Sequence, residues 1–329
     1  MSTLKPNQED VLDLTLRPRT WDEYIGQKKI KQNVRIIIKA AQKRKEAPEH
    51  LLFHGNPGLG KTTIALLIAN EIGTEVRMVS GPSIEKPGDL AAILTNLEPG
   101  TVLFIDEIHR LPKTVEEYLY PAMEDFKLHL VLGKGPMAKI MELEVPKFTL
   151  IGATTRMSAV SGPLRSRFGA NFTLNFYKIE EIEKILERSS KVLQVEIEEK
   201  ALPLIAKCSR FTPRTANHLL KRVRDFAQVE GKGIITPEIT KKALDYLEID
   251  NMGLTETDRR ILQAVCVKFN GGPVGLQALA ASTAEEEGAI LEIYEPYLMR
   301  LGFITRSPRG RMATNRAFEH IKGKKTRLF

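Results

Sequence analysis

The sequence Gly55-Asn56-Pro57-Gly58-Leu59-Gly60-Lys61-Thr62 follows an apolar run, Leu51-Leu52-Phe53, and precedes a helix-like run from Thr63 to Ile72. This is the G-x-x-x-x-G-K-T pattern in the strand–loop–helix setting that a P-loop requires. Its glycines let successive backbone N–H groups surround the phosphates of a nucleotide, and the positive end of the following helix adds to that attraction. We expect Lys61 to reach the β- and γ-phosphates and the hydroxyl of Thr62 to bind Mg²⁺. The flanks on both sides argue against a chance glycine-rich turn.

The length and composition of the chain indicate several domains without a membrane span. At 329 residues the chain is too long for one compact core, which predicts two or three domains, and its 42% apolar residues are enough for packed cores. The two cysteines, Cys208 and Cys266, lack metal-ligand spacing, which fits a reducing compartment. The polar opening MSTLKPNQED does not resemble a signal peptide, and no run is long enough to cross a bilayer. We therefore expect a soluble, cytoplasmic protein.

The positive charge is concentrated at the C-terminal end of the chain. The formal net charge is +8, and residues 300–329 contain nine Lys or Arg against one acid, Glu319, which is also +8. Residues 1–299 therefore balance at 40 basic and 40 acidic residues. An excess confined to one end indicates a polyanion-binding surface there. A solvated basic tail is the alternative for Lys322 to Arg327.

The first half of the chain alternates short apolar runs with helical patterns, which predicts a parallel sheet with helices on both faces. Thr114 is placed to cap one of these helices, with Glu117 three residues later. Runs at 128–132 and 140–145 flank Gly133-Lys134-Gly135-Pro136 and predict an inserted β-hairpin. The other expected elements are helices over 27–44, 88–97 and 114–124 and strands over 75–79, 102–105 and 148–153.

The second half of the chain is mostly helical and divides into two small units. Pro213 and Pro237 fall at helix starts, where proline is tolerated. The last unit ends in two short strands around Pro308-Arg309-Gly310, and three helices followed by a basic hairpin predict a winged helix. A protein-docking module is the alternative for this unit, and the charge placement favours DNA. The expected elements are helices over 179–193, 197–208, 213–229, 236–247, 255–268, 274–281 and 284–301, and strands over 303–306 and 311–314, in domains spanning 1–176, 177–252 and 253–329.

Two acidic residues follow the buried strand expected at 102–105. An acid at the end of such a strand beside a P-loop can hold Mg²⁺, and Asp106 fits that role. Glu107 is then placed to orient the attacking water or to accept its proton, because metal and lysine stabilise charge without activating the nucleophile. Thr155 follows the strand expected at 148–153 and is expected to touch the γ-phosphate or the water. Outside a nucleotide site, Thr155 would be read as a β-branched strand end.

Three arginines are candidates for stabilising negative charge in the transition state: Arg165, Arg167 and Arg214. A guanidinium suits this task because its planar fork stays charged and binds phosphate oxygens through two donors. Surface arginines are common, so each of these arginines, considered alone, would be interpreted as structural.

These residues together resemble an AAA+ ATPase: the P-loop, Asp106-Glu107, Thr155, and Ser166-Arg167-Phe168 before a helical lid with Arg214. More narrowly, the chain resembles the RuvB family, bacterial motors that drive branch migration of Holliday junctions. The resemblance implies an α/β AAA+ P-loop parallel-sheet domain with an inserted β-hairpin, a small helical lid domain and a C-terminal winged-helix domain. The matching stretches are 16–18, 24–27, 80–91, 104–111, 120–126, 151–156, 222–229, 271–276, 295–298 and 308–311.

The resemblance also implies roles for residues of the ATP or ADP site. Arg167 is expected to be an arginine finger that enters the neighbouring subunit's site, so that catalysis depends on a hexameric ring. Arg214 is expected to sense the nucleotide from the lid of its own chain. Catalysis is assigned to Lys61, Glu107, Thr155 and Arg167, and Mg²⁺ binding to Thr62 and Asp106. The remaining nucleotide-binding residues are Leu16, Arg17 and Tyr177 around the adenine and ribose, Gly58, Gly60, Lys61, Thr62 and Thr63 around the phosphates, and Glu124, Asp125 and Phe126.

The partners implied by the resemblance are DNA and other recombination proteins. The hairpin over 128–145 is expected to dock RuvA, the junction-binding partner, through exposed apolar residues such as Leu130, Val131 and Ile140. The RuvC resolvase is a further expected partner. The winged helix is expected to touch the DNA backbone through its wing, where the DNA-binding residues are Arg306, Arg309 and Arg311.

The chain departs from the family pattern at Asn56, where the family usually has proline, and we expect this change to be harmless. Two other functions stay open at this point. A clamp-loader-like AAA+ switch would use ATP to open and place a protein ring at DNA, although the winged helix and the inserted hairpin argue against it. A DNA-binding regulator would use its ATPase only to set its oligomeric state.

Overall fold

A computed structural model describes residues 14–132 and 139–325, and these form two compact units. The sheet unit consists of Arg17–Gly55 and Leu59–Asn175. The helical unit consists of the described chain from Phe176 onward together with Asn56–Gly58 and residues 14–16. Within the described residues, no helix is both long and apolar enough to span a bilayer.

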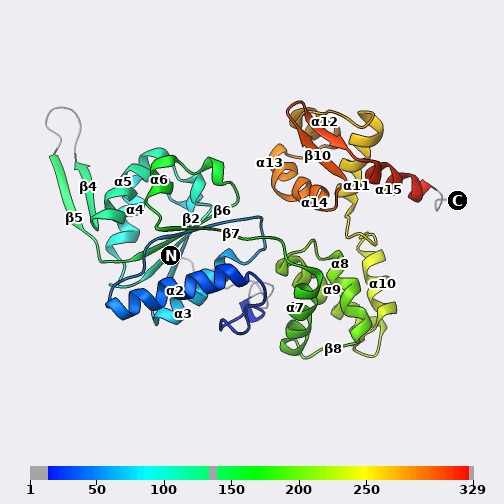
Figure 1. Ribbon diagram of the computed structural model, residues 1–329, viewed down its shortest axis with the longest axis horizontal. Helices are drawn as coiled ribbons and strands as arrows, with labels where there is room; N and C mark the ends of the chain where they lie inside the picture. Colours follow the sequence, from blue (N-terminus) through cyan, green and yellow to red (C-terminus); the bar gives the residue numbers. More distant parts are fainter. Residues whose placement is uncertain (1–13, 133–138, 326–329) are drawn as a thin grey trace. The chain divides into compact units, whose positions relative to one another are not determined.

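A parallel sheet forms the centre of the sheet unit, as predicted (Figure 1). The order of its strands among the described residues is β2-β3-β6-β1-β7. All neighbours in this order run parallel. The strands are β1 (Leu51–His54), β2 (Val76–Ser80), β3 (Val102–Asp106), β6 (Thr149–Thr154) and β7 (Ala170–Thr173).

The sequence analysis left the strand order open. In the structure β6 lies between β1 and β3, the strand that carries Asp106. Ile151 of β6 pairs with Leu51 on one side and with Phe104 on the other. Every residue of β6 is buried, which is the burial expected of a central strand. The segment that follows β6 and begins at Thr155 therefore leaves the sheet from its central strand.

Helices cover both faces of this sheet (Figure 1). On one face α3 packs against the strands and α2 packs against α3. On the other face, α4, α5 and α6 share one core with the sheet, in which Leu90, Leu119 and Leu164 are fully buried. The helices of this unit are α2 (Lys28–Arg44), α3 (Lys61–Ile72), α4 (Pro87–Thr95), α5 (Lys113–Glu124) and α6 (Gly162–Ser166), with short 3₁₀ turns η1 (Gly81–Ser83), η2 (Ile108–Arg110) and η4 (Met157–Ala159).

The predicted cap of α5 was wrong. The residue before this helix is Pro112, and no side chain caps it, so Thr114 lies inside the first turn. Proline suits this position because its fixed φ, here −59°, is compatible with a helix start and it has no N–H to leave unsatisfied. The helix therefore starts one residue before Thr114.

His50 is a buried structural residue beside the sheet. Its Nδ1 accepts a hydrogen bond from the backbone N–H of Leu150 at 2.9 Å, and its Nε2 lies 3.0 Å from the carbonyl oxygen of Met123. Because Nδ1 is an acceptor, Nε2 carries the proton and donates it. Burial lowers the pKa of His50, with the Met123 contact acting against that shift.

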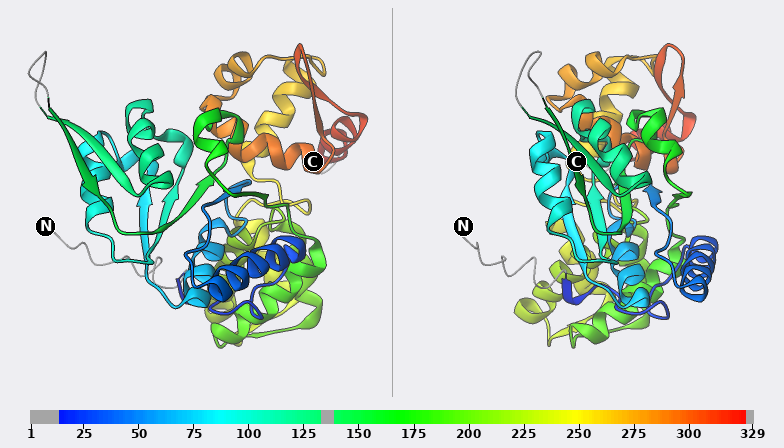
Figure 2. Two further views of the ribbon diagram at one scale, coloured as in Figure 1. Left: turned by 60° about the vertical axis from the view of Figure 1, so that its left-hand side comes forward. Right: turned by 90° about the vertical axis from the view of Figure 1, so that its left-hand side faces the viewer.

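The predicted hairpin is present and extends from the sheet unit (Figures 1 and 2). It consists of β4 (Lys127–Leu132) and β5 (Lys139–Glu144), which pair antiparallel. The expected turn, Gly133 to Pro136, lies outside the described residues. Leu130 is half-buried and packs against the core of the sheet unit, and the side chains of Val131 and Ile140 are likewise outside what is described.

The first part of the helical unit has the predicted helices. Pro213 and Pro237 occupy the first turns of α9 and α10, and the hydroxyls of Thr212 and Thr236 cap them by accepting backbone N–H groups at 3.3 Å. A two-residue parallel pair, β8 and β9, was not predicted. The elements are α7 (Ile179–Val192), β8 (Glu196–Ile197), η5 (Glu199–Ala201), α8 (Leu202–Cys208), α9 (Pro213–Glu230), β9 (Ile234–Ile235) and α10 (Pro237–Tyr246).

The C-terminal part has the predicted winged-helix order of helices and a hairpin, followed by a helix that was not predicted. This last helix, α15 (Asn315–Lys325), buries Ala317 and packs Phe318 and Ile321 against the local core. Lys322, for which a solvated tail was the alternative above, is an exposed residue of this helix. The preceding elements are α11 (Glu256–Gln263), η6 (Ala264–Lys268), α12 (Leu276–Thr283), α13 (Glu287–Ala289), η7 (Ile290–Tyr294), α14 (Glu295–Arg300), β10 (Ile304–Ser307) and β11 (Gly310–Ala313), where η6 and η7 are π-helical.

A buried ion pair joins the two parts of the helical unit. Arg210, which follows α8, donates to both carboxylate oxygens of Asp258 in α11 at 3.1 Å. The Asp258 side chain has no exposed surface, and the guanidinium lies 4.6 Å from the ring centre of Tyr297. Arg210 also donates to the carbonyl oxygen of Ile293 at 2.9 Å. The helices before and after this joint are therefore held together by charge-assisted hydrogen bonds.

Candidate functional site

The P-loop glycines adopt backbone conformations that other residues rarely reach. Gly58 and Gly60 have φ values of 80° and 102°. A Cβ atom on Gly55 would lie 2.9 Å from the carbonyl oxygen of Leu174, and one on Gly58 would lie 2.9 Å from the Cβ of Arg214. No side chain caps α3, which starts directly after Gly60. The first N–H groups of this helix therefore point out of its N-terminus with no acceptor inside the helix, which is the arrangement that binds phosphate.

Lys61 is buried, with 7% of its surface exposed. Its ammonium donates to the carbonyl oxygen of Gly55 at 2.7 Å, which places the positive charge beside the first residue of the loop. The charge affects His54, the last residue of β1: burial lowers the pKa of His54, and the nearby Lys61 lowers it further. His54 therefore adds little positive charge at neutral pH. The sequence analysis gave His54 no role, although a polar residue ending a buried strand was the available signal.

Asp106, Glu107 and Thr155 meet at the carboxyl edge of the sheet. Glu107 has a left-handed backbone (φ 51°), and its N–H donates to Asp106 Oδ1 at 3.0 Å. Thr155 Oγ1 lies 3.5 Å from Glu107 Oε2, at the outer limit of a hydrogen bond. The backbone here is closely packed, because a Cβ on Gly81 would lie 2.5 Å from the carbonyl oxygen of Glu107. The structure therefore brings the predicted base and the predicted strand-end threonine together.

His109 is a further member of this group. Its Nε2 lies 3.5 Å from Glu107 Oε2, and its Nδ1 lies 2.9 Å from Thr154 Oγ1. The same Thr154 oxygen accepts the backbone N–H of Arg156 at 2.9 Å. A chain of polar contacts therefore runs from the end of β6 to the carboxylate of Glu107. His109 stands in a stretch that matched the family, but the sequence alone gave no reason to connect it with Glu107.

The residues present fit a magnesium–nucleotide complex better than a metal ion alone. The described residues contain no group of three or more His, Cys, Asp or Glu side chains that could hold a metal by themselves. Asp106 and Thr62 offer oxygen ligands, and Mg²⁺ is commonly bound by one or two carboxylates together with substrate phosphates and water. The donor set is therefore complete only with the phosphates present.

The predicted arginine finger lies against its own chain. Arg167 Nε is 3.2 Å from Glu124 Oε1, and the guanidinium lies 4.3 Å from the ring centre of Tyr120. Its Nη1 donates to the carbonyl oxygen of Pro163 at 2.8 Å. Arg167 and Glu124, both assigned to the nucleotide site, are thus paired with each other. Arg165 is exposed.

The other predicted nucleotide residues are spread over both units. In the sheet unit Asp125 is exposed, while Phe126 is half-buried with its ring edge-on to Phe148. Arg17 is half-buried, as are Thr62 and Thr63 in the first turn of α3. In the helical unit Leu16 and Tyr177 are buried: Arg188 donates to the carbonyl oxygen of Leu16 at 2.8 Å, and the Tyr177 N–H donates to that of Phe211 at 3.0 Å. Arg214 is exposed in the first turn of α9.

The three wing arginines differ in exposure. Arg309 lies at the exposed turn between β10 and β11. Arg306 is 51% exposed, whereas Arg311 is only 11% exposed. Both of these pair with Glu295, the first residue of α14, which is 2% exposed. The sequence analysis treated the three arginines as equivalent because partners so distant in the chain were not visible to it.

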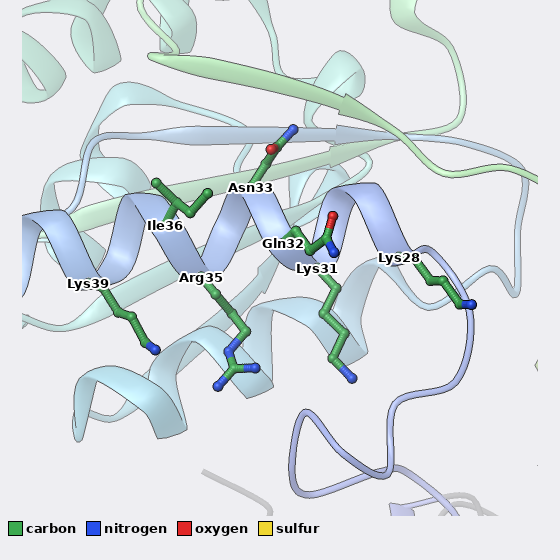
Figure 3. Close-up of a pocket in the computed structure, with 7 residues that line it drawn as sticks. All are labelled: Lys28, Lys31, Gln32, Asn33, Arg35, Ile36 and Lys39. Carbon is green, nitrogen blue, oxygen red and sulfur yellow. The ribbon is translucent and has the colours of Figure 1, made fainter.

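A basic depression lies on α2 of the sheet unit (Figure 3). The sequence of α2 carries seven Lys or Arg and no acid. One of its cations is already engaged, since the Lys31 ammonium donates to the carbonyl oxygens of Trp21 and Tyr24. In the described structure none of the predicted site residues is among those that line it, which are Lys28, Lys31, Gln32, Asn33, Arg35, Ile36 and Lys39.

Comparison with known proteins gave consistent matches along the chain. Residues 16–174 match the model of the Holliday junction DNA helicase RuvB P-loop domain, residues 177–250 that of the RuvB AAA lid domain, and residues 251–322 that of the RuvB C-terminal winged helix domain. Among solved structures, Thermotoga maritima RuvB, described as a Holliday junction branch migration motor, is 48% identical, with a TM-score of 0.86 over 94% of this chain and 98% of that chain. A lysine-to-arginine mutant of the same Thermotoga protein is 48% identical with a TM-score of 0.87, over 93% of this chain and 98% of that one.

Proposed function

Since the chain belongs to the RuvB family of Holliday junction DNA helicases, we propose that it is an ATP-driven ring motor that pulls duplex DNA through itself and so moves Holliday junctions during recombination and repair. The observation that carries the proposal is the group at the carboxyl edge of the sheet. There Asp106 and Glu107 at the end of β3 meet Thr155 at the end of β6, and the neighbouring strand β1 leads into the P-loop and Lys61. This group has the parts that hydrolysis of a nucleoside triphosphate needs.

The first step assigned to this chain is holding the triphosphate. The N–H groups at the start of α3 and the ammonium of Lys61 bind the phosphate oxygens, and Gly58 and Gly60 leave room for the backbone to approach them. Thr62 and Asp106 supply oxygen ligands for Mg²⁺, which when bound neutralises charge on the β- and γ-phosphates.

Glu107 is the base of the proposed reaction. Its carboxylate orients a water molecule and accepts a proton from it as the water attacks. Thr155 and His109 flank one carboxylate oxygen, Oε2, at 3.5 Å each. These contacts are long, and catalytic hydrogen bonds often tighten only when substrate is bound.

In the proposed ring, a neighbouring subunit supplies further positive charge to stabilise the transition state. Arg167 leaves Glu124 and enters the site of the neighbouring subunit, where its fork stabilises the transition state. Arg214 senses the nucleotide from the lid of its own chain. The domain boundaries that go with this proposal are residues 1–176, 177–252 and 253–329.

The proposed partners are those expected of such a motor. RuvA docks on the hairpin of β4 and β5, where Met141 is 38% exposed and Leu130 is half-buried, so that Met141 joins the expected contacts. Duplex DNA binds the wing, the RuvC resolvase acts on the same junction, and a hexameric ring forms in the bacterial cytoplasm.

A synthetic four-way junction tests the function directly. With ATP and RuvA, the protein is expected to convert the junction into two duplexes, and Glu107→Gln is expected to bind ATP but leave the junction intact. Hydrolysis without conversion in the presence of RuvA would refute the motor. That result would favour a clamp-loader-like switch or a regulator, neither of which moves junctions.

A further inference from the structure

Helix α2 of the sheet unit carries seven Lys or Arg side chains and no Asp or Glu. Two of these cations have partners: Lys31 donates to the carbonyl oxygens of Trp21 and Tyr24, and Arg44 lies 2.8 Å from Glu46. Residues 1–299 balance in charge overall, so α2 concentrates positive charge locally. Among the described residues no oxygen pairs with the side chains of the other five cations, which are Lys28, Lys29, Arg35, Lys39 and Lys43.

Helical spacing brings cations of α2 to one side of the helix. Lys31, Arg35 and Lys39 follow one another at intervals of four residues and form a row with a spacing of about 6 Å along the axis. Figure 3 shows these three side chains leaving α2 on the same side, with Asn33 and Ile36 on the other. Like charges at this spacing repel, and the buried Nε of Arg35 has no acceptor in the described structure. An anion bound along the row would relieve the repulsion.

The lining of the depression on α2 identifies the kind of ligand that fits it. Its volume of about 570 Å³ is that of a small-molecule pocket, but such pockets are lined mostly by apolar and aromatic side chains. Here every lining residue except Ile36 is a hydrogen-bond donor, and no carboxylate is among them. The depression therefore suits an extended ligand that presents acceptors and negative charge.

Two polyanions meet this description, the DNA backbone and an acidic protein segment. A protein segment binds through apolar anchors as well as charge. Among the described residues of α2, Ile36 is the one exposed large apolar side chain, and in Figure 3 it points away from the row. The duplex backbone needs no such anchor, because it presents one negative charge per about 1.7 Å of its length. The row therefore favours DNA phosphates.

We propose that α2 is a second DNA-binding surface, on which Lys28, Arg35 and Lys39 bind phosphates of the duplex backbone without reading base sequence. Each cation then displaces counterions from the DNA, which makes the contact depend on salt. The surface belongs to the sheet unit, whereas the proposed wing contact belongs to the helical unit. The proposal rests on the proposed function, because it takes duplex DNA as the substrate, and it adds a contact outside the wing.

The test measures binding of the full-length protein to a fluorescently labelled duplex over a series of salt concentrations. Lys28→Ala combined with Lys39→Ala is expected to weaken binding roughly tenfold and to flatten the salt slope by about 1.8, the value of two phosphate contacts. The matched control combines Lys29→Ala with Lys43→Ala, which removes the same charge from exposed positions of α2 that do not line the depression. It is expected to leave the slope close to that of the wild type. Alanine is a strong helix former, so both pairs keep α2 folded.

Two outcomes would overturn the second surface. Equal effects of the two pairs would show general attraction by net charge, which acts without a defined site. An unchanged duplex affinity after Lys28→Ala and Lys39→Ala would show that α2 does not bind DNA. Loss of poly-L-glutamate binding by that same protein would then identify an acidic protein as the partner of α2.

Failure of this surface and failure of the proposed function are measured separately. Neither Lys28 nor Lys39 is assigned to the nucleotide site, so the double variant should hydrolyse ATP at the wild-type rate without DNA. In Arg309→Ala protein the same pair is expected to flatten the slope by about 1.8 again, because contacts in separate units add. No further flattening there would overturn a surface separate from the wing. Wild-type protein that gives the expected slopes but leaves the four-way junction intact would overturn the motor and keep the surface on α2.

Discussion

Arg210→Ala tests the joint between the two parts of the helical unit. The change removes three hydrogen bonds to Asp258 and Ile293 and the contact with Tyr297. Removing one partner of a buried ion pair costs about 3–5 kcal/mol, because the other charge stays buried. Asp258 keeps the N–H and hydroxyl of Thr255 as donors, at 3.0 and 2.7 Å, so we expect the lower end of that range.

The assay measures the thermal unfolding of each variant in a scanning calorimeter. A loss of about 3 kcal/mol in a unit of this size lowers the unfolding temperature by roughly 6–12 °C. Lys191→Ala is the control, since it removes an exposed i,i+4 pair with Glu187 on α7 and is expected to cost about 0.3–0.5 kcal/mol. Arg210→Lys should fall between the two, because it keeps the charge without the fork. A shift for Arg210→Ala no larger than that of Lys191→Ala would refute the structural role of the joint.

Four further outcomes are expected. Lys61→Ala should abolish ATP hydrolysis and weaken ATP binding, and near-normal turnover would refute the P-loop assignment. Arg167→Ala subunits should bind ATP but hydrolyse it only when mixed with Lys61→Ala subunits, and failure of mixing to restore activity would count against a finger acting in trans. His109→Phe should lower kcat roughly tenfold with little change in KM, since its polar contact with Glu107 is lost; an unchanged kcat would separate His109 from the base. The free energy of unfolding should fall as the pH drops below about 6.5. Burial lowers the pKa of His50 in the folded state, so the unfolded chain binds the proton first and is favoured. A His50→Gln variant with the same dependence of this free energy on pH would contradict this.

Local patterns in the sequence were sufficient to predict much of the fold. The P-loop, the buried strands and the prolines at the starts of α9 and α10 are signals that lie within a few residues of the element they define. The same holds for the winged helix, whose basic turn sits between two short strands. The family assignment followed from stretches of this kind spread along the chain.

What the sequence did not provide depends on residues far apart in the chain. The position of β6 between β1 and β3 is a matter of strand pairing, which leaves no mark in a strand's own pattern. The strands β8 and β9 form one pair that is too short to show a period, and the basic residues of α15 hid the spacing of Ala317, Phe318 and Ile321.

The polar partners in the sites were hidden for the same reason. Glu295 could not be linked to Arg306 and Arg311 before the hairpin was placed against α14. The contact of His109 with Thr154 likewise joins η2 to the end of β6, two segments that only the sheet brings together.

The ion pair of Arg167 with Glu124 has a consequence for a subunit that stands outside a ring. With Glu124 53% exposed, the ion pair contributes at most about 1 kcal/mol, and the contact with Tyr120 adds about as much. In a single chain these two weak contacts hold the guanidinium of Arg167, the proposed arginine finger, beside Glu124 and Tyr120. Two charge-assisted hydrogen bonds to a neighbour's phosphate would together contribute more free energy than the contacts with Glu124 and Tyr120. If Arg167 is the arginine finger proposed above, binding of a neighbour loaded with ATP is expected to release it from Glu124, and an empty neighbour is expected to leave the pair intact.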